Sequence, residues 1–290
     1  MNRLNPLNDF LFQKMLGERG CEPQLKALLN ALLASTGRKP LSEIQIIENT
    51  TLPPDIIGAK KSILDIRSQT PDRSKINIEV QLANEYNIGK RNVFYVSREM
   101  IKGIAAGQDY RELPQVIGIN ILGFSPFPLE RYHTSFHLRE DLNPEFILTD
   151  VIEMHFIDMP RFRKLAKKDV VENSEHRWLS YLNPATSRED AEELIKMDEG
   201  IARAQAIMDQ ITRDEKLLHA YEMYEMTLSD ETSRLNGARE EGEALGLAKG
   251  EVLGLAKGRR EVAKNFKAMG LSAEQIAAAT GLSPAEIARL

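Results

Sequence analysis

Residues 63–81 read ILDIRSQTPDRSKINIEVQ, and this stretch decides the fold. Apolar and polar residues alternate over 75–81, which is the period of a strand with one buried face. Residues 63–67 are also dense in apolar residues, and turn formers such as Pro, Asp and Ser separate the two segments. We therefore expect 63–67 and 75–81 to pair as an antiparallel hairpin.

The polar face of this predicted hairpin carries two carboxylates. In a ladder centred near residue 72, Asp65 lies opposite Glu79, within reach of one cation. Magnesium takes hard oxygen ligands and keeps most of its waters, so these carboxylates and the backbone carbonyl of Val80 suffice to hold it. Gln81 shares the face with Glu79 and is placed to orient a water. We expect this face to line a cleft, although the same spacing also fits a surface hairpin with polar residues outward.

Charge is distributed unevenly along the chain. The segment from Lys60 to Lys102 carries a net charge of +4, whereas the chain as a whole carries −5, so the remainder is −9. A local excess of cations around embedded carboxylates suits a site that attracts a polyanion beside a metal ion, and chance fluctuation on a solvated surface is the alternative. For Arg98, an ion pair with a core carboxylate remains the alternative to phosphate contact. The candidate DNA contacts are Lys60, Lys61, Arg67, Lys90, Arg91, Arg98 and Lys102.

The composition of the 290 residues is that of a globular protein, with 42% hydrophobic and 28% charged residues. The one cysteine, Cys21, excludes an internal disulfide and a Cys-based zinc site. No apolar run approaches the roughly 20 residues that span a bilayer, and the first residues lack a secretory signal. We expect a cytoplasmic protein without a membrane partner.

The rest of the chain combines helical and strand patterns. Two amphipathic helices precede residue 36, and residues 88–106 are expected to form a helix. From residue 160 onward the period is helical, which indicates a mixed α/β core with a helical appendage. His133 and His137 lie four apart in a strand-like segment, where that spacing favours ordinary histidines over a metal pair. The predicted apolar stripe of the helix is Val93, Val96, Met100 and Ile104, and the further predicted strands are 44–48, 114–123, 132–138 and 151–158.

The C-terminal region is repetitive. Glycine recurs every fourth residue from Gly242 to Gly258, which would cost a helix about 5 kcal/mol at roughly 1 kcal/mol each. Either this segment is a flexible arm, or the glycines allow another helix to approach closely; both alternatives stay open. Residues 270–277 and 281–288 repeat a serine cap followed by a short helix. The second helix is short and poor in Arg and Lys, so packing or pairing is favoured over DNA readout.

Several motifs of the chain resemble those of a known family. They are NDFLFQK (8–14), ILDI (63–66), NIEVQ (77–81), RNVFYVSR (91–98), GQDY (107–110), PQVIGINIL (114–122), HFIDMPRF (155–162) and WLSYL (178–182). Over about residues 5–230 the chain resembles the recombination-promoting nuclease (Rpn) family, also described as PD-(D/E)XK nuclease-family transposases. A glycine-rich, repetitive tail is likewise familiar in this group.

The resemblance implies a restriction-endonuclease-like α/β fold: a mixed sheet flanked by helices, with a C-terminal helical extension and tail. It implies magnesium-dependent DNA cleavage that leaves 5′-phosphate and 3′-hydroxyl ends, with Mn²⁺ or Ca²⁺ as substitutes. Asp65 and Glu79 match the motif's acidic positions, and Gln81 stands where the motif usually has Lys. Glutamine orients water but adds no positive charge, which implies a slower variant. Asp9 is either a further metal ligand or an acid interacting with the dipole of its helix.

The leading hypothesis is a magnesium-dependent DNA endonuclease with little sequence specificity, linked to recombination or mobile elements. The alternatives are a catalytically weak or inactive DNA-binding or assembly protein with a nuclease fold, and a component of a defence or toxin-like system. Whether the substrate is DNA or RNA stays open. The expected organisation is a nuclease-like core (1–160), a helical extension (161–236) and a glycine-repeat arm with a short helical hairpin (237–290) that mediates homo-oligomerisation.

Overall fold

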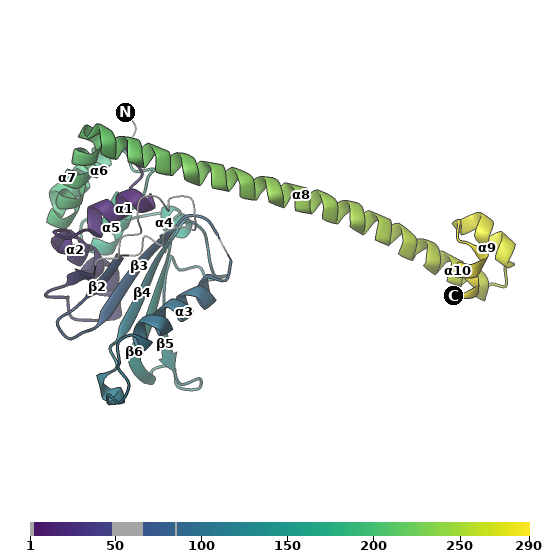
Figure 1. Cartoon of the computed structure of the whole chain (residues 1–290), viewed down its shortest axis with the longest axis horizontal. Coiled ribbons are helices and arrows are strands. Elements are labelled where there is room, and N and C mark those ends of the chain that lie inside the picture. The colour runs from purple at the N-terminus through teal and green to yellow at the C-terminus, as the bar shows by residue number, and fades with distance from the viewer. Residues whose placement is uncertain (1–2, 48–65, 85) are drawn as a thin grey trace. The chain divides into compact units, whose positions relative to one another are not determined.

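The computed structural model describes residues 3–47, 66–84 and 86–290 (Figure 1). The chain divides into two compact units, Met1–Glu225 and Met226–Leu290. Among the described residues, no helix combines the length and the apolar character that crossing a membrane requires.

A mixed sheet forms the centre of the first unit. In the described part of the chain its strand order is β1-β2-β3-β4-β6-β5, with β3, β4 and β6 parallel and the other pairs antiparallel. The expected strands are confirmed, with ends that differ by up to four residues. Their bounds are β1 (Gln45–Ile47), β2 (Ile66–Gln69), β3 (Lys75–Gln81), β4 (Val116–Leu122), β5 (His133–Arg139) and β6 (Ile147–Asp158).

Strands β2 and β3 form the expected hairpin. Ile66 pairs with Ile78 and Ser68 pairs with Ile76, so the described ladder is centred on residue 72, as the alternation predicts. Every residue of β4 is buried, which confirms the prediction of a strand covered on both faces.

Helices cover both faces of the sheet. One face joins the main hydrophobic core, which contains Ile78 and Ile119 of the sheet, Leu28 of α2 and Trp178 of α5. Helix α3 covers the other face (Figure 1). The helices of this unit are α1 (Asp9–Leu16), α2 (Glu22–Leu33), α3 (Ile88–Ile101), α4 (Met159–Arg163), α5 (Ser174–Leu182), α6 (Arg188–Met197) and α7 (Glu199–Arg213), with the short 3₁₀ turns η1 (Ala34–Thr36) and η3 (Tyr110–Glu112).

The helical segment after residue 160 shares the core of the sheet. Helix α2 packs against α5 and α7, and α1 also packs against α7. The main core accordingly runs from Leu7 in the N-terminal segment to Tyr221. The division of the chain at residues 160 and 236 stays a prediction.

Helix α3 differs from its prediction in length and in orientation. It ends at Ile101, five residues before the expected end. Its buried residues are Ile88, Asn92 and Val96, whereas Val93 is 49% exposed. Val96 is buried as predicted, but Asn92 is buried in place of Val93, because an apolar pattern does not identify a buried polar residue.

A chain of buried polar side chains links β5, β6 and α5. His155 Nε2 lies 2.8 Å from Glu153 Oε1, and His155 Nδ1 lies 2.9 Å from His133 Nε2. His133 Nδ1 in turn lies 2.6 Å from Glu175 Oε1, and the Tyr132 hydroxyl donates to Glu175 over 3.1 Å. These contacts make His133 part of a structural network.

The charges of this network are set by burial and by its neighbours. Burial lowers the pKa of His155. The hydrogen bond to Glu153 raises it, but by less, so the pKa lies below its ordinary value. Burial raises the pKa of Glu153, but the hydrogen bond from His155 and the charge of Arg38 outweigh it, so the net shift is downward. Arg38 Nη2 donates to Glu153 Oε2 over 2.6 Å. A neutral His155 that donates to an ionised Glu153 satisfies both residues.

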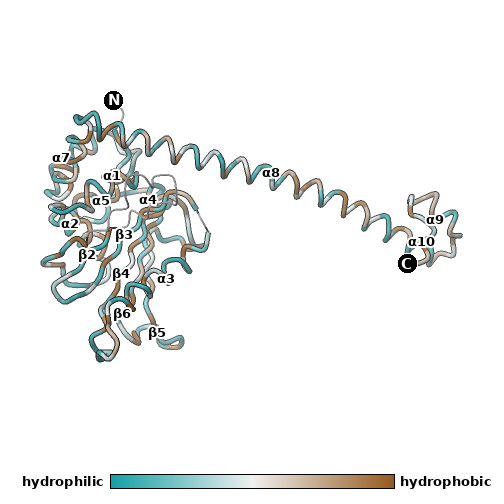
Figure 2. Tube along the Cα trace, viewed as in Figure 1, coloured by the Kyte–Doolittle hydropathy of each residue, from teal (hydrophilic) through white to brown (hydrophobic). Residues whose placement is uncertain are grey.

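Helix α8 (Glu215–Ala268) begins in the first unit and continues into the second. It contains all the regularly spaced glycines, so the repeat is helical, and Figure 2 shows apolar and polar residues mixed along it. The two short helices predicted after it are confirmed as α9 (Ala273–Thr280) and α10 (Pro284–Ala288), each with a serine capping box. Ala263, Ile276 and Ile287 form the small core that holds them to α8.

The contact between α3 and β4 leaves no room for a side chain at Gly118. An added Cβ would lie 3.0 Å from Asn92 Oδ1 and 3.0 Å from Val96 Cγ2. We expect Gly118→Val to lower the free energy of unfolding by about 1–3 kcal/mol, because overpacking displaces α3. Chemical denaturation measures this. Gly89→Ala, on the same helix with nothing within 4 Å of the added Cβ, should leave stability unchanged or raise it by up to about 1 kcal/mol. Equal effects of the two substitutions would contradict this packing.

The buried histidine makes stability depend on pH. Because the folded pKa of His155 lies below the ordinary value, the unfolded chain takes up the proton first as the pH falls. The free energy of unfolding should therefore fall between pH 7 and pH 5, by up to about 1.4 kcal/mol per pH unit for this one proton. Urea denaturation of His155→Gln should show a shallower pH slope than the native sequence. His219→Gln, which changes an exposed histidine, should keep the native slope; an unchanged slope in His155→Gln would refute the assignment.

Candidate active site

Glu79 lies near the carboxyl end of β3 and is only 9% exposed. Because alternate residues of a strand share a face, Asn77 and Gln81 lie on the same side of the sheet as Glu79. Gln81 is also buried. Both side chains are therefore buried, with Arg91 of α3 against Glu79, and the cleft expected along this face stays a prediction.

Arg91 of α3 contacts Glu79 directly. Its Nη2 donates to Glu79 Oε1 over 3.2 Å, and its guanidinium lies 5.9 Å from the centre of the Tyr95 ring. The positive charge of Arg91 compensates the negative charge of Glu79 where water has little access. Arg91 was expected to contact phosphate, whereas the structure places it against the candidate catalytic carboxylate.

Two side-chain oxygens on this face have no hydrogen-bond partner among the described residues. They are Gln81 Oε1 and Asn77 Oδ1, each shielded from solvent. Buried polar atoms are normally paired, so this amide oxygen can accept from a water, bind a cation or pair with a group outside the described residues. The donor set of Glu79 and Gln81 consists of hard oxygens, which fits a magnesium site.

Sequence reasoning missed a pair of asparagines beside this site. Asn120 of β4 lies opposite Glu79 in the sheet register. Asn92 of α3 donates to Asn120 Oδ1 over 2.9 Å, and Asn120 donates to the backbone oxygen of His155 over 3.0 Å. These bonds join α3, β4 and β6 behind Glu79. The sequence did contain a signal for Asn120, because it is a lone polar residue in an otherwise apolar strand.

Cations from three elements surround Glu99 of α3. Its carboxylate lies 2.9 Å from Lys102, 3.7 Å from Arg67 and 3.9 Å from Lys75. Burial raises the pKa of Glu99, but the hydrogen bond from Lys102 and the three positive charges outweigh it, and the pKa is lowered overall. One carboxylate facing three cations leaves a net positive charge on this surface. Two of the predicted DNA contacts, Arg67 and Lys102, meet here.

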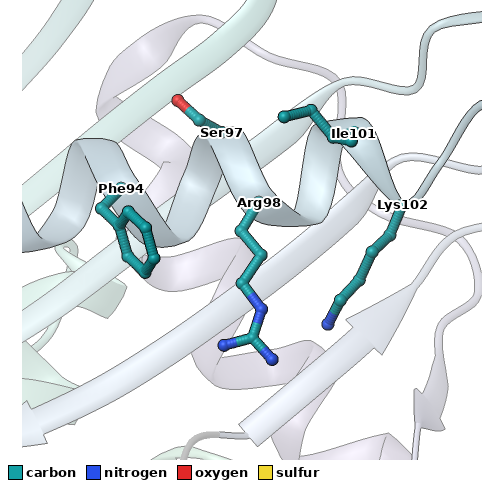
Figure 3. A pocket seen from close by; sticks show the side chains of 5 residues that line it. All are labelled: Phe94, Ser97, Arg98, Ile101 and Lys102. Atoms are coloured by element: carbon teal, nitrogen blue, oxygen red, sulfur yellow. The ribbon is translucent and has the colours of Figure 1, made fainter.

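Arg98 extends the positive charge along α3. A surface pocket of about 290 Å³ is lined by Phe94, Ser97, Arg98, Ile101 and Lys102. Figure 3 shows Phe94, Arg98 and Lys102 pointing to one side of the helix, while Ser97 and Ile101 point to the other. Arg98 takes part in none of the ion pairs between described residues, so the alternative of a core carboxylate partner is not supported. Lys90, one turn before Phe94, is exposed on the same helix.

Asp9 belongs to a different contact. It follows the N-cap residue Asn8 and is the first residue of α1. Its Oδ2 accepts a hydrogen bond from the Tyr224 hydroxyl over 3.0 Å. This contact ties α1 to the start of α8, and a metal-binding role for Asp9 stays a prediction.

Three predicted site residues, Asp65, Lys60 and Lys61, lie outside the described residues. Within the described ranges, no group of three or more His, Cys, Asp or Glu side chains could hold a metal ion. Metal binding by Asp65 therefore stays a prediction, and so does metal binding by Glu79 and by the backbone carbonyl of Val80.

Comparison with known proteins agrees with this fold. The family model described as "PD-(D/E)XK nuclease family transposase" matches residues 6–238. Comparisons with curated proteins and with solved structures gave no match. The match covers most of the chain, including the six-stranded mixed sheet of the described residues and the helices that flank it. The chain belongs to the PD-(D/E)XK nuclease family transposases and has a restriction-endonuclease-like fold.

Proposed function

We propose that this protein is a magnesium-dependent DNA endonuclease that cleaves the duplex backbone with little sequence specificity, in recombination or in the movement of mobile elements. Membership of a nuclease family supports nuclease chemistry. The observation that carries the proposal is a buried carboxylate, Glu79, next to the unpaired buried oxygen of Gln81 on the same strand face.

The proposed metal ligands are Glu79, the backbone carbonyl of Val80, and Asp65. Asp65 is the residue before Ile66 in the sequence, and Ile66 pairs with Ile78, the residue before Glu79. Bound there, Mg²⁺, or Mn²⁺ or Ca²⁺ in its place, would supply charge stabilisation and a more acidic water. Gln81 accepts a hydrogen bond from the attacking water and so orients it. Arg91 holds the Glu79 carboxylate in place.

The proposed DNA surface is the positive face of α3 and its neighbours. Arg67, Arg98 and Lys102 present guanidinium and ammonium groups around Glu99 and along α3, and such groups bind phosphate oxygens. Phosphate contacts carry no sequence information, which is the reason for proposing low specificity.

A second function, DNA binding with little or no cleavage, is favoured by two observations. Gln81 stands where the family motif usually has Lys, and Arg91 already occupies one oxygen of Glu79. Glutamine in place of lysine removes a positive charge from the site. The contact with Arg91 engages a Glu79 oxygen that a metal ion would otherwise bind. The first experiment below separates the two functions.

We also propose that the C-terminal region mediates self-association and that the protein acts in the cytoplasm. A continuous helix with exposed apolar residues supports self-association. The buried thiol of Cys21, whose pKa is raised by burial, is compatible with a reducing compartment.

Plasmid cleavage tests the proposed enzyme. The native chain should nick supercoiled DNA with Mg²⁺ and stop with a chelator. Asp65→Ala and Glu79→Gln should each lower the nicking rate at least about 100-fold, because each removes a ligand oxygen needed in the transition state. Gel densitometry of the supercoiled fraction over time measures the rate.

Glu192→Gln is the matched control for this assay. It removes one carboxylate charge from the exposed surface of α6 and should keep the native rate. Cleavage that survives Glu79→Gln at the native rate would reject the active site proposed here. Magnesium-independent DNA binding without cleavage would establish the second function.

The salt dependence of DNA binding tests the surface of α3. We expect Arg98→Ala to weaken binding and to reduce the slope of log K against log[salt] by about 1, because one phosphate contact is lost. Fluorescence anisotropy with a labelled duplex in EDTA measures this without cleavage. Arg188→Ala on α6, where the side chain is 83% exposed, should leave the slope unchanged. Equal slopes for native chain and Arg98→Ala would remove Arg98 from the DNA surface.

A further inference from the structure

Four exposed side chains form a line along α3, one at every fourth residue. They are Lys90, Phe94, Arg98 and Lys102, the last of which caps the helix. Four residues are slightly more than one turn, so neighbours in this line lie about 6 Å apart along the helix axis. Figure 3 shows Phe94, Arg98 and Lys102 pointing to the same side of the helix. We call these four residues the Phe94 line.

Phe94 is an apolar residue in a charged surface. It is 62% exposed, and a cation stands four residues before it and another four residues after it. Its ring also borders the surface pocket of about 290 Å³ that Arg98 and Lys102 line. A single exposed apolar side chain is common on protein surfaces, but this one lies between cations at the edge of a pocket. The line therefore offers a flat apolar ring and positive charges within one short stretch of helix.

The positive charge of the line is reinforced by the sheet beside it. The Glu99 carboxylate lies 2.9 Å from the Lys102 ammonium group and 3.7 Å from the Arg67 guanidinium of β2. The ammonium group of Lys75 on β3 donates to the Glu99 backbone oxygen over 2.8 Å. One carboxylate therefore stands against three cations, and Arg98, the residue before Glu99, adds a fourth. Such a surplus of positive charge attracts a polyanion.

A nucleic acid strand with unpaired bases matches both properties of the line. Its phosphates pair with cations, and its bases stack on aromatic side chains when they are not held in a double helix. A continuous duplex presents its phosphates to such a surface but keeps the faces of its bases stacked inside, so it would make no stacking contact with Phe94. The exposed ring among cations therefore favours a single strand as the ligand.

We propose that the Phe94 line binds single-stranded DNA, with a base stacked on Phe94 and the phosphates bound by the three cations of the line. The choice of DNA rests on the proposed function, and the proposal deepens that function by naming the substrate class: DNA that contains unpaired nucleotides, as at a gap, a flap or a frayed end. Phe94 follows Arg91 by three residues, and Arg91 contacts Glu79 over 3.2 Å. The unpaired base would therefore lie about one helical turn from the residue that contacts the candidate catalytic carboxylate.

Fluorescence anisotropy in EDTA tests the stacking without cleavage. The probes are a labelled oligo(dT) of about 15 nucleotides and a duplex of the same length. Phe94→Ala in the full chain should weaken oligo(dT) binding about 5- to 150-fold, because it removes one base–aromatic stack. The slope of log K against log[salt] should stay the same, because no cation is lost. Duplex affinity should change by less than about twofold, because the duplex binds through its phosphates.

Two further variants control this measurement. Phe94→Tyr keeps an aromatic ring and should bind oligo(dT) within about threefold of the native chain. Tyr110→Ala removes a residue that is 83% exposed but lies in η3, outside the line, and should leave the binding of both probes unchanged. Equal weakening of oligo(dT) and duplex binding by Phe94→Ala would overturn the proposal, and so would unchanged binding of both probes.

Tryptophan fluorescence reports the stack directly. The native chain has a single tryptophan, Trp178, which is fully buried in the core. Phe94→Trp places an indole on the line, and a base stacked on it should quench its emission as oligo(dT) is added, whereas the duplex should not. Oligo(dT) that binds the Phe94→Trp chain without quenching its fluorescence would overturn stacking at this position.

These results are read independently of the nuclease assay, because binding is measured in EDTA. A native chain that nicks plasmid, but whose oligo(dT) affinity is unchanged in Phe94→Ala, keeps the proposed nuclease and overturns the single-strand site. A chain that never nicks plasmid, but loses oligo(dT) affinity in Phe94→Ala, rejects the proposed enzyme and supports the single-strand site.

Discussion

The negative charge of Glu79 is held inside the protein, between β3 and α3, and much of the first unit is arranged around it. Arg91 supplies the compensating charge at 3.2 Å, and α3 is fixed against the sheet by the Asn92–Asn120 hydrogen bond and the close approach at Gly118. A buried carboxylate lowers stability unless it is paired and hydrogen-bonded, and Arg91 supplies the pairing charge for Glu79.

The sheet near this site could be predicted from the sequence because its signals are local. Alternation over residues 75–81 gave the register of β2 and β3, and the continuous apolar run of β4 gave a strand buried on both faces. The surroundings of Glu79 could not be predicted in the same way. Asn92 is polar and so was not part of the apolar stripe predicted for α3, in which Val96 is buried but Val93 is exposed. Arg91 could be identified as basic, but its partner depends on how α3 packs.

The positive surface shows the same limit. A net charge of +4 over residues 60–102 indicated where cations are concentrated, but Glu99 draws Arg67, Lys75 and Lys102 together from three separate elements. The C-terminal region is the opposite case. The sequence left open an arm or a helix at the glycine repeat, and the structure forms a continuous helix there.

We expect the Glu79 face to bind a divalent cation. Isothermal titration calorimetry with Mn²⁺, in the absence of DNA, tests it most directly, with Glu192→Gln as the control for loss of one carboxylate. The account predicts binding to the native chain and to Glu192→Gln, and loss of that binding in Glu79→Gln. Mn²⁺ binding of equal strength in Glu79→Gln and the native chain would contradict it.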